Sequence, residues 1–401
     1  MNILILTPKV PWPPVDGGSI ATASLAEGLA GKGNQVTVLA INTPKHFVDA
    51  QTVRSFNNPA IRFITYFIDT RIKPWHALTN LLFSVLPYNG VRFYNRGYRI
   101  RLETLLRKEH FDMVQLEGLY MAFYVPAIRY ISNAKIAMRA HNVEYEIWER
   151  TAAQTDNFFK RWYTRILAAR IRRFDTRNLN VYDAVLPITE RDAKTFREMG
   201  CRLPVEVVPA GIDFKRMPLQ ITQTTGMDLF FIGALDWGPN QEGLCWFLDK
   251  CWPQIQKNQS SLVFHIAGRN APVWLVKRLA QNGILYHGEV ENAYEYMAAH
   301  RIMVVPLLSG GGMRIKIIEG MAMGKAIVST PVGAEGIDVQ DSSNIMLGNS
   351  AEIMVDKILQ LVSDEQLLNN ISSRAYADVR EKFNNLRISG SLQEFYKTLI
   401  S

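Results

Sequence analysis

The chain has 401 residues, 48% of them hydrophobic, which excludes a disordered chain and predicts two domains rather than one hydrophobic core. The net charge is +8 but is uneven, since residues 1–200 carry 27 Lys and Arg against 17 Asp and Glu, whereas the rest carry 18 against 20. No apolar run approaches the roughly 20 residues of a membrane span, and the first one is too short for a secretory signal. The three cysteines lack metal-binding spacing, so we expect a cytoplasmic protein with reduced thiols.

The first elements of the chain are an apolar strand at residues 2–7 and a helix at residues 19–30. Gly17 and Gly18 lie at the turn between them. A turn of this kind, at the carboxyl end of a parallel strand, suits a diphosphate or an acceptor. Alternatively, the two glycines only relieve a tight corner after the prolines that precede them.

Two basic stretches follow, at residues 92–108 and 158–173. The second, which includes Arg161–Arg173, alternates aromatic residues and arginines at helical spacing. Such a helix can lie on an anionic membrane surface or meet a polyanionic acceptor, or it can pack an apolar face on the core and leave its arginines solvated. The first basic stretch slightly favours the membrane surface. No nucleic acid is expected, because no nucleic-acid-binding motif accompanies the charge.

Two further strands are predicted in the first half of the chain, at residues 111–116 and 136–141. The second strand ends in His141, which places an imidazole at the carboxyl edge of the sheet. A histidine taken alone is more often structural. Asn142 and Glu144 are its nearest polar neighbours in the sequence.

A strand at residues 302–307 leads into three consecutive glycines, Gly310, Gly311 and Gly312. Because glycine has no Cβ, the backbone here can turn sharply and bring its N–H groups close to a ligand. A helix is expected to begin at Met313. The pattern therefore predicts an anion site at a helix N-terminus.

Three charged residues of this helix support the anion site. Arg314 and Lys316 add positive charge at its N-terminal end, and Glu319 could accept hydrogen bonds from a ribose diol. Alternatively, the three side chains form a solvated helix face with i,i+3 pairing.

The segment Glu319–Val328, with Gly333 and Glu335 after it, resembles the donor-nucleotide segment of the retaining glycosyltransferases of family 4. The first Glu of that family's Glu-x7-Glu motif falls on Gly311 here, as in a glycine-rich branch of the family. The resemblance covers nearly the whole chain. It implies an α/β protein of the GT-B fold, with two Rossmann-like domains facing each other across a cleft.

The resemblance also implies the domain boundaries. An acceptor-binding domain is expected at residues 1–204, a hinge at 205–225 and a nucleotide-sugar-binding domain at 226–380. A C-terminal helix, residues 381–401, is expected to cross back to the first domain.

The resemblance assigns catalytic roles to three residues: His141 would contact the donor sugar, Lys316 the diphosphate and Glu319 the ribose. The backbone of Gly311–Met313 would replace the missing first Glu. Arg269, with Arg314 and Lys316, would replace two cations that the family often carries after the first strand of this domain. Val290 lies in a segment similar to the loop that holds the base. The residues expected to bind the donor are Gly17, Gly18, Arg269, Val290, Gly310, Gly311, Gly312, Met313 and Arg314.

The implied activity is transfer of a sugar, with retention, from a nucleotide-diphosphate sugar to an alcohol on a glycan or a lipid-linked glycan precursor. It would take place in the cytoplasm or peripherally at the inner face of an anionic membrane. No cofactor or metal is expected, because the chain has no Asp-x-Asp. Two alternatives are an epimerase of the same architecture and a non-catalytic nucleotide-sugar-binding protein. An oxidoreductase is disfavoured, because no Gly-x-Gly-x-x-Gly follows the first strand.

Overall fold

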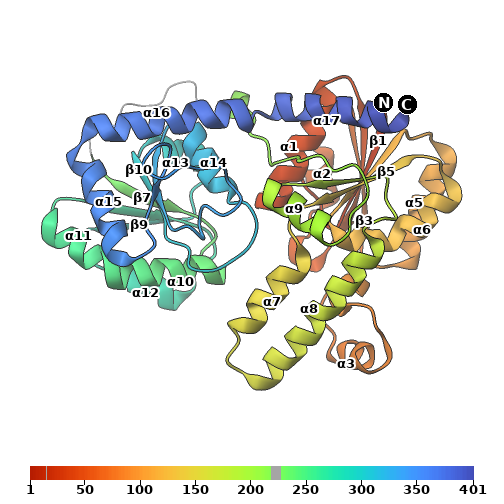
Figure 1. The fold of residues 1–401 in the computed structure, drawn as a ribbon, viewed down its shortest axis with the longest axis horizontal. Helices are drawn as coiled ribbons and strands as arrows, with labels where there is room; N and C mark the ends of the chain where they lie inside the picture. Colours follow the sequence, from red (N-terminus) through yellow and green to blue (C-terminus); the bar gives the residue numbers. More distant parts are fainter. Residues whose placement is uncertain (15, 218–226) are drawn as a thin grey trace. The chain divides into compact units, whose positions relative to one another are not determined.

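The computed structural model describes residues 1–14, 16–217 and 227–401, and these form two compact units (Figure 1). The first unit is Met1–Gly211 with Asn385–Ser401, and the second is Ile212–Asn384. Each unit contains one six-stranded sheet built from parallel strand pairs. The predicted α/β class with two Rossmann-like domains is confirmed. Residues 218–225 of the predicted hinge lie outside the described residues.

The first sheet has the strand order β3-β2-β1-β4-β5-β6. Its strands are β1 (Asn2–Thr7), β2 (Gln35–Asn42), β3 (Ile61–Phe67), β4 (Met113–Glu117), β5 (Lys135–Ala140) and β6 (Ala184–Pro187). Alternate residues of a strand point to opposite faces, so Leu4 and Leu6 of β1 join one apolar cluster and Ile3 and Ile5 another. The sheet is therefore buried on both faces, as expected for parallel strands covered by helices.

The helices of the first unit lie around this sheet, except that Glu144–Ala153 and the start of Phe158–Asn178 extend away from it (Figure 1). They are α1 (Gly17–Gly31), α2 (Ala50–Arg54), α3 (Pro74–Phe83), α4 (Tyr88–Val91), α5 (Arg96–Lys108), α6 (Val125–Ile131), α7 (Glu144–Ala153), α8 (Phe158–Asn178), α9 (Glu190–Glu198) and α17 (Asn385–Ile400), with short 3-10 turns at Pro44–His46 and Leu119–Tyr124. Helix α1 begins two residues earlier than predicted, because the Asp16 carboxylate accepts a hydrogen bond from the Ser19 N–H and caps the helix at Gly17.

The C-terminal helix belongs to the first unit, as expected, although it begins at Asn385 rather than at residue 381. It packs against α1. The Asn385 amide donates to the Ser24 carbonyl at 2.6 Å, and the Tyr396 hydroxyl donates to the Gln115 side chain at 2.5 Å. These buried polar contacts fix α17 on the sheet.

Helices α1 and α17 lie close together at Gly28, and we expect Gly28→Ala to destabilise the first unit by about 1–3 kcal/mol. A Cβ there would lie 2.0 Å from the Ser389 hydroxyl oxygen and 2.9 Å from its Cβ, so the two helices would have to separate. Thermal unfolding measures the effect. Gly31→Ala is the matched control on the same helix, because its Cβ would meet only Leu386, at 3.8 Å. Equal melting temperatures for the two variants would contradict the expectation.

The second sheet has the strand order β12-β11-β10-β7-β8-β9. Its strands are β7 (Leu229–Ile232), β8 (Phe264–Ala267), β9 (Ile284–Gly288), β10 (Ile302–Val305), β11 (Ala326–Ser329) and β12 (Met346–Leu347). The helices of this unit are α10 (Gly238–Trp246), α11 (Trp252–Asn258), α12 (Val273–Leu279), α13 (Ala293–Ala298), α14 (Ile315–Ala322), α15 (Ala351–Ser363) and α16 (Glu365–Lys382), with a 3-10 turn at Phe214–Arg216 and a π-helical segment at Phe247–Cys251.

Two boundaries near the glycine segment differ from the prediction. Strand β10 ends at Val305 rather than at residue 307, because Pro306 has no N–H to donate to the sheet. Helix α14 begins at Ile315 rather than at Met313. The turn between strand and helix is therefore longer than expected.

Within residues 1–14, 16–217 and 227–401, none of the helices combines the length and the apolar character that crossing a membrane would require.

Candidate active site

The glycine turn connects the end of β10 to the start of α14. Gly310 and Gly312 have φ of +112° and +79°, a region that residues with a Cβ rarely adopt. A Cβ on Gly310 would also lie 2.8 Å from an Arg314 nitrogen and 3.2 Å from the Trp237 ring. Backbone conformation and the available space therefore both restrict residue 310 to glycine.

Arg314 closes the turn from the helix side. Its side chain is buried, and its Nη1 donates to the carbonyls of Gly311 and Gly312. The guanidinium also lies over the Trp237 ring, at 5.5 Å from the ring centroid. Arg314, which was predicted to bind the donor, therefore stabilises the glycine turn, and its positive charge lies next to the backbone of the turn.

Lys316 lies in the first turn of α14 and points toward the end of β7. Its Nζ donates to the Asn240 side chain at 3.1 Å and to the Ile232 carbonyl at 3.4 Å, and it lies 4.3 Å from the Phe231 ring centroid. Burial, together with the positive charge of Arg314, lowers the pKa of Lys316 to about 7. The amine is therefore held in place but lacks an anionic partner among these contacts.

Glu319 lies one turn further along α14. The Tyr294 hydroxyl, from α13, donates to its carboxylate at 3.0 Å. Burial raises the pKa of Glu319 to about 7, against the lowering effect of this hydrogen bond. Two groups that titrate near neutrality thus lie three residues apart on one helix, which is the pattern typical of functional sites.

The remaining predicted residues of the second unit lie in neighbouring loops. Arg269 follows β8, and its carbonyl accepts a hydrogen bond from the Leu235 N–H at 2.9 Å, so it lies beside the loop that follows β7. Val290 lies in the loop after β9, and Met313 lies between the glycine turn and α14. Because β7, β8 and β10 share one sheet, these loops leave it at the same edge.

Binding of a diphosphate should change the protonation of Lys316. The anion favours the charged amine, so above pH 7, where the free Lys316 is mostly neutral, binding should take up about one proton. At pH 6 the amine is already charged and this uptake should vanish. The affinity should accordingly fall as the pH rises from 7 to 9, by up to about tenfold per pH unit.

Calorimetric titration with a nucleoside diphosphate at pH 6 and pH 8, each in two buffers of different ionisation enthalpy, measures this uptake. The experiment is best done in Glu319→Gln, because Glu319 titrates in the same range. An uptake at pH 8 that persists when Lys316 is also replaced by methionine would assign the proton to another group.

Gly17 and Gly18 lie in the first unit, in the first turn of α1. The Asp16 carboxylate occupies the helix N-terminus and pairs with Lys9. Burial raises the pKa of Asp16, but Lys9 and the Ser19 hydrogen bonds outweigh it and lower the pKa to about 2. A Cβ on Gly18 would lie 3.0 Å from the Lys9 Nζ, so the missing side chain makes room for that amine.

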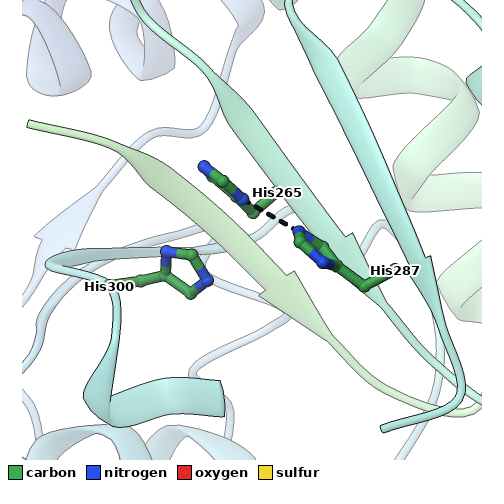
Figure 2. Close-up of side chains that lie close together, drawn as sticks. All are labelled: His265, His287 and His300. Carbon is green, nitrogen blue, oxygen red and sulfur yellow. Dashed lines mark hydrogen bonds between the residues drawn. The ribbon is translucent and has the colours of Figure 1, made fainter.

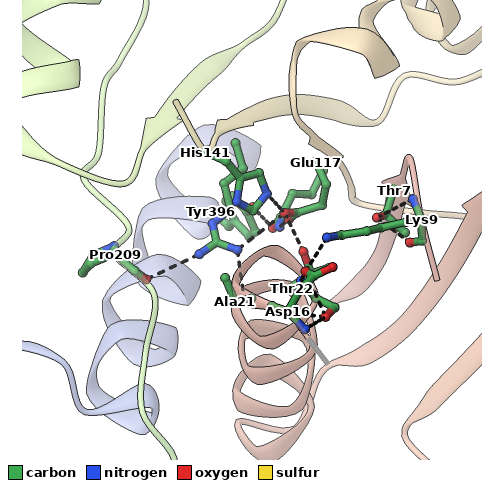
Figure 3. Close-up of polar contacts among 12 residues, drawn as sticks. Thr7, Lys9, Asp16, Ala21, Thr22, Glu117, His141, Pro209 and Tyr396 are labelled. Atoms are coloured by element: carbon green, nitrogen blue, oxygen red, sulfur yellow. Dashed lines mark hydrogen bonds and ion pairs between the residues drawn. The ribbon is translucent and has the colours of Figure 1, made fainter. Parts of the chain in front are cut away.

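His141 also lies in the first unit, directly after β5, and it contacts Glu117 at the end of β4 (Figure 3). Its Nε2 lies 2.6 Å from the Glu117 carboxylate, which is buried and also accepts from Thr22 at 3.0 Å. The guanidinium of Arg139, fully buried, lies 3.5 Å from the same oxygen. Burial alone would raise the pKa of Glu117, but Arg139 and His141 lower it to about 2.

The ionised Glu117 decides which nitrogen of His141 faces outward. A carboxylate only accepts hydrogen bonds, so Nε2 of His141 carries the proton in this contact. In the neutral ring, Nδ1 is then an acceptor, and the ring remains partly exposed, at 24% of its side-chain area. The arrangement can hold a donor or an acceptor group of a substrate, depending on ring protonation.

The two neighbours of His141 in the sequence have separate environments. Glu144 begins α7 and accepts from the Tyr120 hydroxyl at 3.3 Å. Burial raises the pKa of Glu144 to about 7, against that hydrogen bond. Asn142 is partly buried. Neither Glu144 nor Asn142 takes part in the contacts that hold His141 and Glu117 together.

Glu117, Asn240 and Tyr294 are among the residues of these sites that had no assigned role in the sequence analysis. A signal for Glu117 was present, because it is a carboxylate at the end of an apolar strand, and parallel pairing sets it opposite Arg139. Asn240 and Tyr294 approach Lys316 and Glu319 from helices far away in the sequence. Nothing in the local sequence indicates those two contacts.

Comparison with known proteins matches both halves of the chain to glycosyltransferases. Residues 15–216 match the family described as Glycosyltransferase Family 4, and residues 226–364 match Glycosyl transferases group 1.

The chain belongs to glycosyltransferase family 4. A relative from Klebsiella pneumoniae, "Uncharacterized 44.6 kDa protein in cps region", is 21% identical and covers 98% of each chain. Among solved structures, sucrose-phosphate synthase from Thermosynechococcus elongatus has a TM-score of 0.71 at 16% identity, over 100% of this chain and 99% of that one. Anabaena HepE, solved with UDP and with UDP-glucose, has a TM-score of 0.70 at 15% identity, over 99% and 100%. These likenesses show the GT-B fold.

Proposed function

We propose that this glycosyltransferase moves a sugar from a nucleotide-diphosphate sugar to an alcohol acceptor, with retention and without a metal ion. The observation that carries the proposal is the glycine turn of residues 310–312 with Lys316 and Glu319 at the start of α14. A helix N-terminus next to a buried amine suits a diphosphate, and a carboxylate one turn further suits a ribose. Uridine is the first base to test, because HepE, which has the same fold, binds UDP and UDP-glucose.

In the proposed reaction, the bond between the anomeric carbon and the phosphate oxygen breaks while the acceptor oxygen attacks from the same face. The acceptor's proton passes to a phosphate oxygen, so no enzyme nucleophile is needed. Negative charge grows on the departing diphosphate, and Lys316 and the N–H groups at the start of α14 stabilise it. This stabilisation would replace that of a divalent cation, which other sites hold through carboxylates.

The acceptor is proposed to be a glycan of the cell envelope or its lipid-linked precursor. The cps region in the name of the Klebsiella relative supports it. The test incubates the full chain with UDP-glucose, other nucleotide sugars and a lipid-linked oligosaccharide in EDTA, and determines the product's anomeric configuration by NMR. A transferred sugar with the donor's configuration supports the proposal. Donor epimerised without an acceptor, or bound but unchanged, would favour the two alternatives of the sequence analysis.

We also propose that one surface of the first unit contacts an anionic membrane, where a lipid-linked acceptor would lie. Exposed aromatic side chains gather at the start of α8, in Phe158, Phe159 and Trp162, beside the exposed Lys160. Helix α3 lies next to α8 (Figure 1), because Arg170 of α8 donates to the Leu81 carbonyl at 2.7 Å. Helix α3 adds four exposed large apolar side chains: Trp75, Leu78, Leu82 and Phe83. The rest of α8 buries its other face in the core, so both predicted roles of this helix have support.

The membrane proposal predicts that the protein co-sediments with vesicles that contain phosphatidylglycerol and less with phosphatidylcholine alone. Replacing Phe159 and Trp162 with serine should weaken binding more than tenfold, because each buried aromatic side chain contributes about 1.5–3 kcal/mol. Tyr130→Ser is the control, since Tyr130 is an aromatic side chain of another helix, α6, and is 85% exposed. Equal binding by all three proteins would contradict the proposal.

A further inference from the structure

Three of the seven histidines of the chain gather in the second unit (Figure 2). His265 lies on β8, His287 on the neighbouring β9, and His300 between α13 and β10. One ring nitrogen of each lies within 4.8 Å of the corresponding nitrogens of the other two. The nearest pair is Nδ1 of His265 and Nε2 of His287, at 2.9 Å.

An aspartate next to this cluster orients its imidazole rings. The Asp228 carboxylate contacts Nδ1 of His300 and lies 3.8 Å from Nε2 of His265. It also accepts the Arg301 N–H at 3.1 Å, which fixes its position. A carboxylate on one imidazole nitrogen orients the ring and leaves the other nitrogen for a ligand, the arrangement found behind metal-binding histidines. The nitrogen of His300 that remains available is therefore Nε2.

The rings are also held by aromatic neighbours: Phe230 stacks on His300, and Tyr296 contacts both His287 and His300. The three imidazoles are thus packed against aromatic rings, with one nitrogen of each near the nitrogens of the other two.

We propose that His265, His287 and His300 bind a divalent transition-metal ion of the zinc class. Three imidazoles suit Zn²⁺, Ni²⁺ or Cu²⁺, and a tetrahedral zinc site places its ligand nitrogens roughly 3.4 Å apart. The separations here, from 2.9 Å to at most 4.8 Å, bracket that value, so small ring movements suffice. His287 is exposed, which leaves the fourth position open to solvent.

The proposed ion would act on α13. This helix carries Tyr296, whose ring lies 5.4 Å from His287 and 4.8 Å from His300, and Tyr294, which donates to Glu319. An ion that fixes the histidines would therefore fix the helix that presents Tyr294. Such a role is structural, and it is independent of whether sugar transfer itself needs a metal.

The test uses the full chain without a histidine tag, stripped with EDTA, dialysed and kept free of nucleotide. ZnCl₂ is titrated by calorimetry and by thermal unfolding, and CoCl₂ reports four-coordinate geometry by its visible absorption. We expect one ion per chain at micromolar affinity or tighter, and a raised melting temperature. His287→Asn should weaken binding at least tenfold and abolish the cobalt band, while its exposed position should leave the fold intact by circular dichroism.

His110→Asn is the matched control, because His110 is an exposed histidine of the first unit. It should bind zinc as the wild type does. His265→Asn is a second ligand variant with the same expected loss. Equal zinc binding by the wild type and His287→Asn, or no binding by the wild type, would overturn the proposal and leave a cluster of stacked imidazoles.

Discussion

Replacing Lys316 with methionine should weaken the binding of UDP, or of the nucleotide that proves to be the donor's, about 10- to 100-fold. The Lys316 amine lacks an anionic partner in the contacts described above, and a hydrogen bond to a charged group contributes about 1.5–3 kcal/mol. Methionine fills similar space without the charge. Burial of methionine does not carry the desolvation cost of burying a charged amine, which is the cost that lowers the pKa of Lys316. The melting temperature should therefore not fall markedly. Calorimetric titration measures the change.

The control for this prediction is Lys277→Met, which removes a charge from the exposed face of α12 in the same unit. It should bind the nucleotide as the wild type does. If Lys316→Met bound with wild-type affinity, the diphosphate would have to lie elsewhere, and the glycine turn would have only a structural role.

Replacing His141 with alanine should lower kcat for sugar transfer about 100-fold or more while leaving the affinity for UDP unchanged. We expect His141 to contact the donor sugar, and UDP lacks that sugar. Removing one group that stabilises a transition state typically costs a factor of about 10²–10³ in kcat. Steady-state kinetics with the complete donor, combined with calorimetry using UDP, separates the two effects.

His110→Ala serves as the control in these kinetics, and the melting temperature of His141→Ala shows whether the first unit stays folded. Because Glu117 is also held by Thr22 and Arg139, loss of the imidazole should leave the buried ion pair in place. An unchanged kcat for His141→Ala would mean that the pair of His141 and Glu117 is structural.

The sequence predicted the fold well, because parallel strands buried on both faces leave a clear apolar signal. The strand at residues 2–7 was placed with the bounds that the structure has. Boundaries set by single side chains were missed. Asp16 moves the start of α1 to Gly17, and Pro306 ends β10 early. A capping hydrogen bond and a missing N–H each act on one residue, and periodicity over a longer window does not detect them.

The site was predictable only where its residues are adjacent in the sequence. The glycine turn, Lys316 and Glu319 share one short segment, so the sequence predicted that they lie together at a helix start, and the phosphate site there stays a prediction. Their partners Asn240 and Tyr294 come from α10 and α13, and the sequence does not indicate that these helices meet α14. The histidine cluster likewise depends on the pairing of β8 with β9, which brings residues 22 positions apart into contact.

The central claim is that the glycine turn and the start of α14 hold the donor's diphosphate, and hydrogen exchange of this segment tests it most directly. The full chain in EDTA is exchanged alone and with the nucleotide that raises its melting temperature most, and the peptide covering residues 309–323 is followed by mass spectrometry. We predict that the nucleotide slows exchange of the amides from Gly311 to Ile315, and that Lys316→Met reduces this protection. Nucleotide binding that protects other segments and leaves this peptide unchanged would contradict the claim.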